Sequence, residues 1–154
     1  RLQMDDPAVF GTVLLEEALV VAVAECDSLA QSTAPLALRD LTDTTLIVYP
    51  NRPRPSYADQ VLQLFRNQSL CPAHVHEVRE LQTALGLVAA QGGVAIVPRS
   101  VQRLRLGGMV YRSLEGTENV SPVIMRRRRN DLTPEGRIFE QLAREVYESH
   151  GDDD

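Results

Sequence analysis

The residues with the clearest chemical potential lie in a proline-rich segment and at the start of the helix predicted after it. The apolar run Leu46–Tyr49 is typical of a strand, and the segment Asn51–Pro55 follows it. Ser56 lies at the expected cap position, with Asp59 three residues later as a variant of the capping box. The N–H groups and positive dipole at such a helix start favour an anion. We expect the amides of Ser56 and Tyr57 to bind a carboxylate, with the Tyr57 ring as an apolar wall; the alternative is that Ser56 only caps its helix.

The remaining reactive side chains show no signature of catalysis or metal binding. The sequence contains no GxSxG, HExxH or CxxC motif, and no GxGxxG after a strand. All 16 cationic side chains are arginines, which excludes a Schiff-base lysine and the lysine of a phosphate-binding loop. Cys26 and Cys71 are too few for a disulfide framework, and His74 and His76 lack partners at ligand spacing. The sequence therefore predicts no catalytic residue, no metal site and no cofactor.

Composition and charge are those of an ordinary globular domain. The chain has 154 residues, of which 44% are hydrophobic and 24% charged, with a net charge of −5. This acidic balance argues against nucleic-acid binding by this segment, and the run Arg126–Arg129 is interpreted as a solvated edge. The longest apolar run, Ala18–Ala24, is far shorter than the ~20 residues of a membrane helix, so no membrane association is expected.

Apolar periodicity predicts strands that alternate with helices. Three runs without alternation are typical of strands buried on both faces: Leu19–Ala24, Leu46–Tyr49 and Val94–Val97. Further strands are predicted at Val75–Val78, Met109–Leu114 and Pro122–Met125, and a loop at Glu25–Pro35. Helices are predicted from Tyr57 to about Asn67, over Leu81–Val88 with Gly92–Gly93 as the stop, over Val101–Leu106, and after Thr133 with a stripe of Phe139, Leu142, Ala143 and Val146. The pattern indicates an α/β domain with a largely parallel sheet.

Two stretches of this sequence resemble a known protein family. They are Tyr49–Gln60 (YPNRPRPSYADQ) and Glu77–Ala90 (EVRELQTALGLVAA), the second continuing to Val94–Pro98 (VAIVP). Both resemble the effector-binding domain of LysR-type transcriptional regulators, in the subgroup that controls aromatic-compound degradation through catechol and muconate. Asp6–Ala8 and the final helix up to Tyr147 also fit, so the resemblance covers nearly the whole chain.

The resemblance implies a fold and a binding site. The fold is periplasmic-binding-protein-like (type 2) with two lobes, and the second lobe has three αβα layers. The effector lies between the lobes, and Pro55, Ser56 and Tyr57 hold its carboxylate. Leu81 and Val123 match apolar positions of this site. The implied effectors are muconate-like dicarboxylates or aromatic acids.

The same resemblance implies how the chain is divided. Residues 1–16 close lobe one and cross over, residues 17–120 form lobe two, residues 121–148 return to lobe one, and residues 149–154 are an acidic tail. The N-terminal helix-turn-helix and the first part of lobe one lie outside this sequence. We therefore expect the apolar stripe of the last helix to pack on polypeptide outside these 154 residues; the alternative is that this helix is poorly ordered.

The implied function is that of a non-enzymatic, cytoplasmic sensor in a transcriptional regulator. Its partners would be a small carboxylate effector, further copies of itself, promoter DNA through a helix-turn-helix outside this chain, and RNA polymerase as a candidate. One alternative is the extracytoplasmic solute-binding protein of a transporter, which shares the architecture. Another is an enzyme of similar fold, against which the residues near Ser56 offer no evident acid–base pair.

Overall fold

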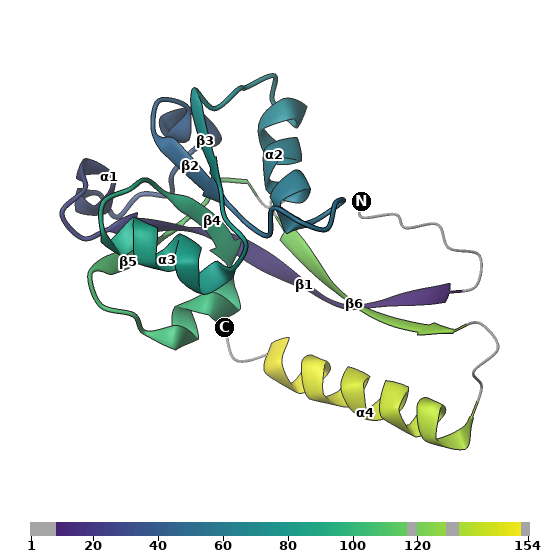
Figure 1. The fold of residues 1–154 in the computed structure, drawn as a ribbon. Helices are drawn as coiled ribbons and strands as arrows, with labels where there is room; N and C mark the ends of the chain where they lie inside the picture. Colours follow the sequence, from purple (N-terminus) through teal and green to yellow (C-terminus); the bar gives the residue numbers. More distant parts are fainter. Residues whose placement is uncertain (1–8, 117–119, 129–132, 152–154) are drawn as a thin grey trace. The chain divides into compact units, whose positions relative to one another are not determined.

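The computed structural model describes residues 9–116, 120–128 and 133–151 (Figure 1). The chain divides into two compact units. The first is built from residues 18–120, and the second from the segment before residue 18 and the segments after residue 120. The long strand β1 (Val9–Ala24) contributes its first half to the second unit and its second half to the first.

The elements of the first unit follow the predicted alternation of strands and helices. After β1 come α1 (Ser28–Gln31), η1 (Leu38–Leu41), β2 (Thr45–Val48), α2 (Tyr57–Asn67), β3 (His74–Glu77), α3 (Leu81–Ala89), β4 (Ala95–Pro98), η2 (Arg99–Leu104) and β5 (Met109–Ser113). The predicted strands after β1 and the two amphipathic helices are confirmed within a few residues, whereas β1 begins at Val9, ten residues before the predicted start at Leu19. The predicted loop Glu25–Pro35 is wrong in part, because Asp27 caps the short helix α1 by accepting a hydrogen bond from the Leu29 N–H. The helix expected at Val101–Leu106 is a 3₁₀ helix that starts earlier, and it ends where Arg105 adopts a left-handed conformation.

The sheet is mixed, which corrects the expectation of a largely parallel one. Strands β2 and β3 are parallel, with Leu46 opposite Val75, and a parallel bridge joins Leu46 to Val94, the residue before β4. In contrast, β1 runs antiparallel to both β4 and β5. An apolar run without alternation indicates a strand buried on both faces, but carries no information on its direction. The path of the chain between strands sets the direction.

Two apolar clusters cover the two faces of this sheet, which gives the first unit the expected three αβα layers. Successive residues of β1 alternate between them: Leu19, Val21 and Val23 lie in one cluster, whereas Val20 and Ala22 lie in the other. Helix α2 packs on the first cluster through Ala58, Val61 and Phe65, and α3 packs on the second through Ala84, Leu85 and Val88. Burial on both faces explains why these strands lack the alternation of a half-exposed sheet.

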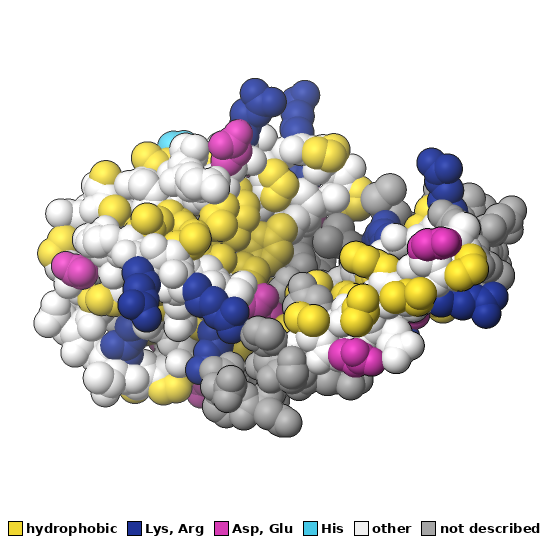
Figure 2. All heavy atoms as spheres, turned by 90° about the horizontal axis from the view of Figure 1, so that it is seen from below, with side chains coloured by type: hydrophobic (Ala, Val, Ile, Leu, Met, Phe, Trp, Pro, Cys, Tyr) yellow, Lys and Arg dark blue, Asp and Glu magenta, His cyan; other side chains and the backbone are white. Residues whose placement is uncertain are grey.

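The second unit pairs the first half of β1 with β6 (Val120–Arg128) and carries α4 (Pro134–Gly151). Arg127 lies 4.9 Å from the centroid of the Phe10 ring and 3.6 Å from a carboxylate oxygen of Glu140 in α4. Figure 2 shows a row of hydrophobic side chains along α4. Among them, Phe139 is 65% exposed and Leu142 is 53% exposed. Three residues of the predicted stripe, Phe139, Leu142 and Val146, are thus exposed in the described part of the chain, whereas Ala143 is half-buried. The packing of this stripe on further polypeptide stays a prediction.

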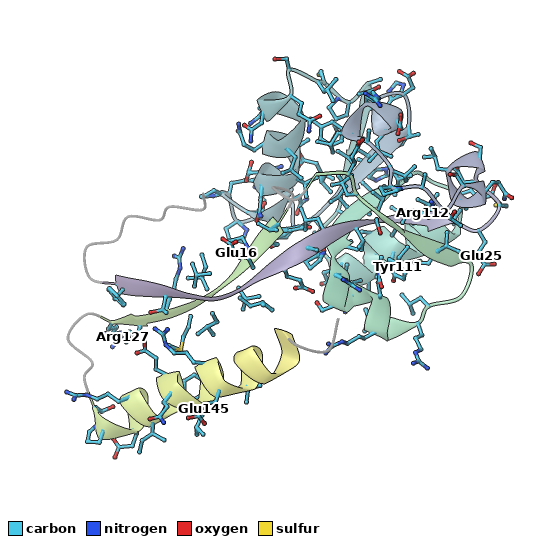
Figure 3. The ribbon with its side chains drawn as sticks, turned by 180° about the vertical axis from the view of Figure 1, so that it is seen from behind. Glu16, Glu25, Tyr111, Arg112, Arg127 and Glu145 are labelled. Atoms are coloured by element: carbon cyan, nitrogen blue, oxygen red, sulfur yellow. The ribbon has the colours of Figure 1, made fainter. Side chains whose placement is uncertain are left out.

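A buried arginine attaches α1 and the segment after it to β5. Arg112 is 8% exposed, and its guanidinium donates to the carbonyl oxygens of Ala34 at 2.6 Å and Ala30 at 3.4 Å (Figure 3 labels Arg112). Carbonyl acceptors satisfy part of its donor capacity in a site largely removed from water. The sequence pattern did not distinguish this arginine from the fifteen others, because its partners are some 80 residues away.

Tyr111, its neighbour on β5, carries a buried hydroxyl without a hydrogen-bond partner in the described part of the chain. An unsatisfied buried donor is destabilising, so Tyr111→Phe should raise the free energy of unfolding by about 1 kcal/mol. Burial also raises the pKa of Tyr111 above its ordinary value of 10.0. The folded state therefore holds this proton more tightly, and wild-type stability should fall as pH rises above 10.

Urea unfolding at about pH 8 and about pH 10.5 tests this prediction. Because the chain contains no lysine, few other groups titrate in that range. The Tyr111→Phe substitution should remove part of the alkaline loss of stability. Tyr57→Phe is the matched control, since the Tyr57 hydroxyl donates to the Ile96 carbonyl oxygen at 3.3 Å and its loss should not stabilise the protein. A Tyr111→Phe variant less stable than wild type at pH 8 would contradict the prediction.

Candidate functional site

The predicted anion site lies where the carboxyl ends of neighbouring strands meet. Because β2 and β3 are parallel, the segments that follow them leave the same edge of the sheet. The proline-rich segment follows β2, and the Asn51 N–H donates to the Val78 carbonyl oxygen just after β3 at 2.9 Å. Helix α2 then begins at Tyr57 and α3 begins at Leu81. This edge, outside the carboxyl ends of parallel strands, is where α/β sheets commonly bind ligands.

Ser56 is the N-cap residue of α2, and both its N–H and its hydroxyl form hydrogen bonds within the chain. Its N–H donates to a carboxylate oxygen of Asp59 at 2.7 Å, and its hydroxyl donates to the Pro50 carbonyl oxygen at 2.8 Å. The residue is 6% exposed. The capping-box variant expected from the sequence is therefore present, and the Ser56 N–H already has an acceptor within the chain. An effector carboxylate at this amide would share it with Asp59 or displace Asp59.

The Tyr57 ring packs against Tyr49, a residue that the sequence analysis does not single out. Its ring lies 5.3 Å from that of Tyr49, centroid to centroid, at an interplanar angle of 40°. Because the Tyr57 hydroxyl donates to Ile96 in β4, the ring is held across the ends of the strands. Aromatic faces of this kind suit a flat, apolar ligand body. Tyr49 is the last residue of the predicted strand Leu46–Tyr49. An apolar residue there is equally typical of packing within the sheet, so the sequence does not indicate its contact with Tyr57.

Arg54 connects the proline-rich segment, α2 and β3. Its guanidinium donates to the Asn51 carbonyl oxygen at 3.1 Å, to a Glu77 carboxylate oxygen at 2.7 Å and to Asp59. Burial acts to raise the pKa of Asp59, but the Ser56 N–H and Arg54 outweigh it and hold that pKa below its ordinary value of 3.8. The hydrogen bond with Glu77, aided by Asp59, raises the pKa of Arg54. Asp59 therefore stays ionised and paired beside Ser56.

The other predicted site residues are divided between the two units. Pro55 is exposed in the proline-rich segment, and Leu81 is half-buried at the start of α3, packed on the same cluster as Tyr49. Val123 is half-buried in β6 and belongs to the second unit. The first unit therefore brings Pro55, Ser56 and Tyr57 together by chain continuity, with Leu81 at the same edge of the sheet.

A separate hollow of the first unit contains none of these residues. Its volume is about 480 Å³, and its lining includes Leu38, Arg39, Gln68, Leu70 and Glu115. Within residues 9–116, 120–128 and 133–151, no group of three or more His, Cys, Asp or Glu side chains is arranged to hold a metal ion. The same residues include no helix long and apolar enough to span a membrane.

The sequence matches a known family over almost its whole length. Residues 1–148 match the model of the LysR substrate-binding domain. The probable cat1 operon transcriptional activator of Acinetobacter lwoffii is 43% identical over 150 residues, covering 97% of this chain and 49% of that protein. The HTH-type transcriptional regulator CatR of Pseudomonas putida is 44% identical over 135 residues, covering 87% of this chain and 46% of CatR. The chain thus spans about half the length of these curated relatives.

A solved structure shows the same fold. The effector-binding domain of BenM with its effector benzoate is 33% identical and superposes with a TM-score of 0.90. The match covers 100% of this chain and 70% of the BenM domain. These similarities extend through the segments that carry Ser56, Tyr57 and Leu81.

Proposed function

The chain belongs to the family of LysR substrate-binding domains, and we propose that it is the ligand-sensing part of a transcriptional regulator of aromatic-compound degradation. The relatives at 43% and 44% identity are named as transcriptional regulators, which favours this function over a transporter's solute-binding protein or an enzyme. The BenM domain, of the same fold, was solved with benzoate as its effector. The proposed ligand is an aromatic acid or a muconate-like dicarboxylate.

The observation that carries this proposal is the arrangement at the start of α2. A helix N-terminus, a capping serine and two aromatic rings lie at the carboxyl edge of β2 and β3. The helix end provides partial positive charge for a carboxylate, and the rings provide an apolar face for the body of the ligand. Pro55, Ser56 and Tyr57 are the proposed contacts of the carboxylate, and Leu81 and Val123 are proposed apolar contacts.

The proposed mechanism is a shift of population between conformations. An effector increases the population of the conformation that binds it more tightly. The free energy of this shift cannot exceed the difference between its binding free energies for the two conformations. The response would pass to promoter DNA through a helix-turn-helix in a part of the protein outside this chain. We also propose that the complete regulator associates with further copies of itself and contacts RNA polymerase.

Ligand binding to the complete protein is the direct test. Benzoate and cis,cis-muconate should each be titrated by calorimetry and then added in thermal-unfolding experiments. A ligand present at a hundred times its dissociation constant should stabilise the folded state by about 2.7 kcal/mol. Benzamide, which lacks the carboxylate, serves as the control ligand and should bind more weakly. Absence of heat and of a thermal shift with both acids would reject the proposed effector class.

A further inference from the structure

The position of Asp59 creates an electrostatic difficulty for an anionic effector. One Asp59 oxygen accepts the Ser56 N–H at 2.7 Å, the group proposed to meet the effector carboxylate, and Glu77 lies on the other side of the Arg54 guanidinium. Two carboxylates at one helix start repel each other, because like charges at close range destabilise their ionised forms. A binding site for acids in this place needs the negative charge of its own carboxylates reduced.

Arg54 is placed to offset one of the two negative charges. Its Nη1 contacts the Asp59 oxygen that does not face Ser56, and its Nη2 lies 2.7 Å from Glu77. Its Nε donates to the Asn51 carbonyl oxygen, so the three guanidinium nitrogens are used on three separate groups. The guanidinium presents its N–H groups in several directions, so one side chain reaches all three groups.

We propose that Arg54 determines the preference of this site for anions, by offsetting one unit of the negative charge that Asp59 and Glu77 place beside the effector carboxylate. This inference rests on the proposed function, since it concerns the same helix start. Arg54 acts through Asp59 and is a positioning residue for the site. Removing its charge leaves two carboxylates unbalanced where the effector carboxylate binds.

Arg52 provides a matched control two residues earlier. It is exposed, and no hydrogen bond or ion pair joins it to the described residues. Arg52→Gln removes the same unit charge from the same segment without touching the pairs of Arg54. A general loss of positive potential would therefore affect both variants, whereas loss of the specific pairing affects only Arg54→Gln.

The experiment is calorimetric titration of the complete protein with benzoate and cis,cis-muconate. Arg54→Gln should weaken benzoate binding by about tenfold, and muconate, with its two carboxylates, by more. Adding Asp59→Asn to Arg54→Gln should recover most of the affinity, because an amide oxygen still accepts the Ser56 N–H without a negative charge. Arg54→Lys should also retain most of it, and Arg52→Gln should stay within about threefold of wild type.

Stability is measured in parallel without ligand. The Arg54, Asp59 and Glu77 side chains are 33%, 37% and 46% exposed, so water screens their pairs and Arg54→Gln should unfold near the wild-type temperature. Should Arg54→Gln fail to fold, two single variants still decide: Arg54→Lys must keep the affinity for benzoate, and Asp59→Asn must not lower it.

Each outcome of the titrations has one meaning. Wild-type affinity in Arg54→Gln overturns the role of Arg54 but leaves the effector class in place. Equal losses in Arg54→Gln and in its Asp59→Asn double variant overturn the charge argument, because the segment would then need Arg54 for shape alone. No binding of either acid by wild type rejects the proposed function, and this inference with it.

Discussion

Gly93→Ala is expected to destabilise the chain by about 3–5 kcal/mol, because it adds a methyl group to a strained and crowded position. Gly93 has φ of +139°, a conformation that L side chains rarely adopt. A Cβ built there would lie 2.2 Å from the Thr45 carbonyl oxygen and 3.0 Å from its carbonyl carbon. The clash is with backbone, which cannot rotate away as a side chain could.

The expected loss is large because this contact joins β2 to the start of β4. The Val94 N–H donates to the same Thr45 oxygen at 2.9 Å, and the Ile47 N–H donates to the Val94 carbonyl oxygen at 2.8 Å. A methyl group on residue 93 would force these hydrogen bonds apart at the centre of the core.

Gly86→Ala is the matched control for Gly93→Ala. Gly86 lies in α3, and a methyl group added to it would meet no atom within 4 Å apart from its chain neighbours and the adjacent backbone of its own helix. Alanine there should stabilise the chain by about 0.5–1 kcal/mol through helix propensity. Urea and thermal unfolding of both variants provide the measurement. If Gly93→Ala cost less than about 1 kcal/mol, the close approach of Thr45 would be refuted.

Phe65→Ala is expected to cost about 3–5 kcal/mol and to weaken effector binding as well. Phe65 is 0% exposed and is the largest of the fully buried side chains among the described residues. It packs in the cluster that attaches α2 to the sheet, together with Val61 and Ala58. Truncation of Phe65 leaves a cavity under the helix whose N-terminus carries the candidate site. The free energy of unfolding should therefore fall, and Ser56 should be held less firmly in place.

Gln63→Ala is the matched control, because it tests whether the loss of stability in Phe65→Ala comes from the buried position of Phe65 or from any substitution in α2. Gln63 is exposed on α2 and donates to the Asn67 side chain at 2.8 Å. Its loss should change the free energy of unfolding by less than about 0.5 kcal/mol. Urea unfolding measures the first effect, and titration with benzoate measures the second. Comparable stability of the Phe65→Ala and Gln63→Ala variants would show that α2 is not anchored through Phe65.

Most elements of the first unit could be predicted from local pattern. The spacing of Tyr57, Val61 and Phe65 predicts α2, and Ser56 with Asp59 predicts its start, because a helix cap needs groups three residues apart. The runs that became β2 and β4 were recognisable because burial on both faces removes alternation. The same local reasoning located the helix start that carries Ser56 and Tyr57.

What the pattern could not provide is anything that depends on residues far apart in sequence. The antiparallel direction of β1 follows from chain path, and the role of Gly93 follows from the approach of Thr45, nearly fifty residues earlier. The sequence does not distinguish Arg112 from the other arginines, because the carbonyl oxygens of Ala30 and Ala34 that accept its hydrogen bonds are distant in sequence.

The candidate site shows the same division. Helix periodicity, the cap and the proline-rich segment are local, so the sequence by itself determined where an anion could meet free helix-end amides. The capping box that places Asp59 on the Ser56 amide is local as well. The tertiary structure alone decided that Arg54 joins Asp59 to Glu77 on another strand. Charges interact through space, and the distance between Arg54 and Glu77 is set by the pairing of β2 with β3, which sequence spacing does not encode.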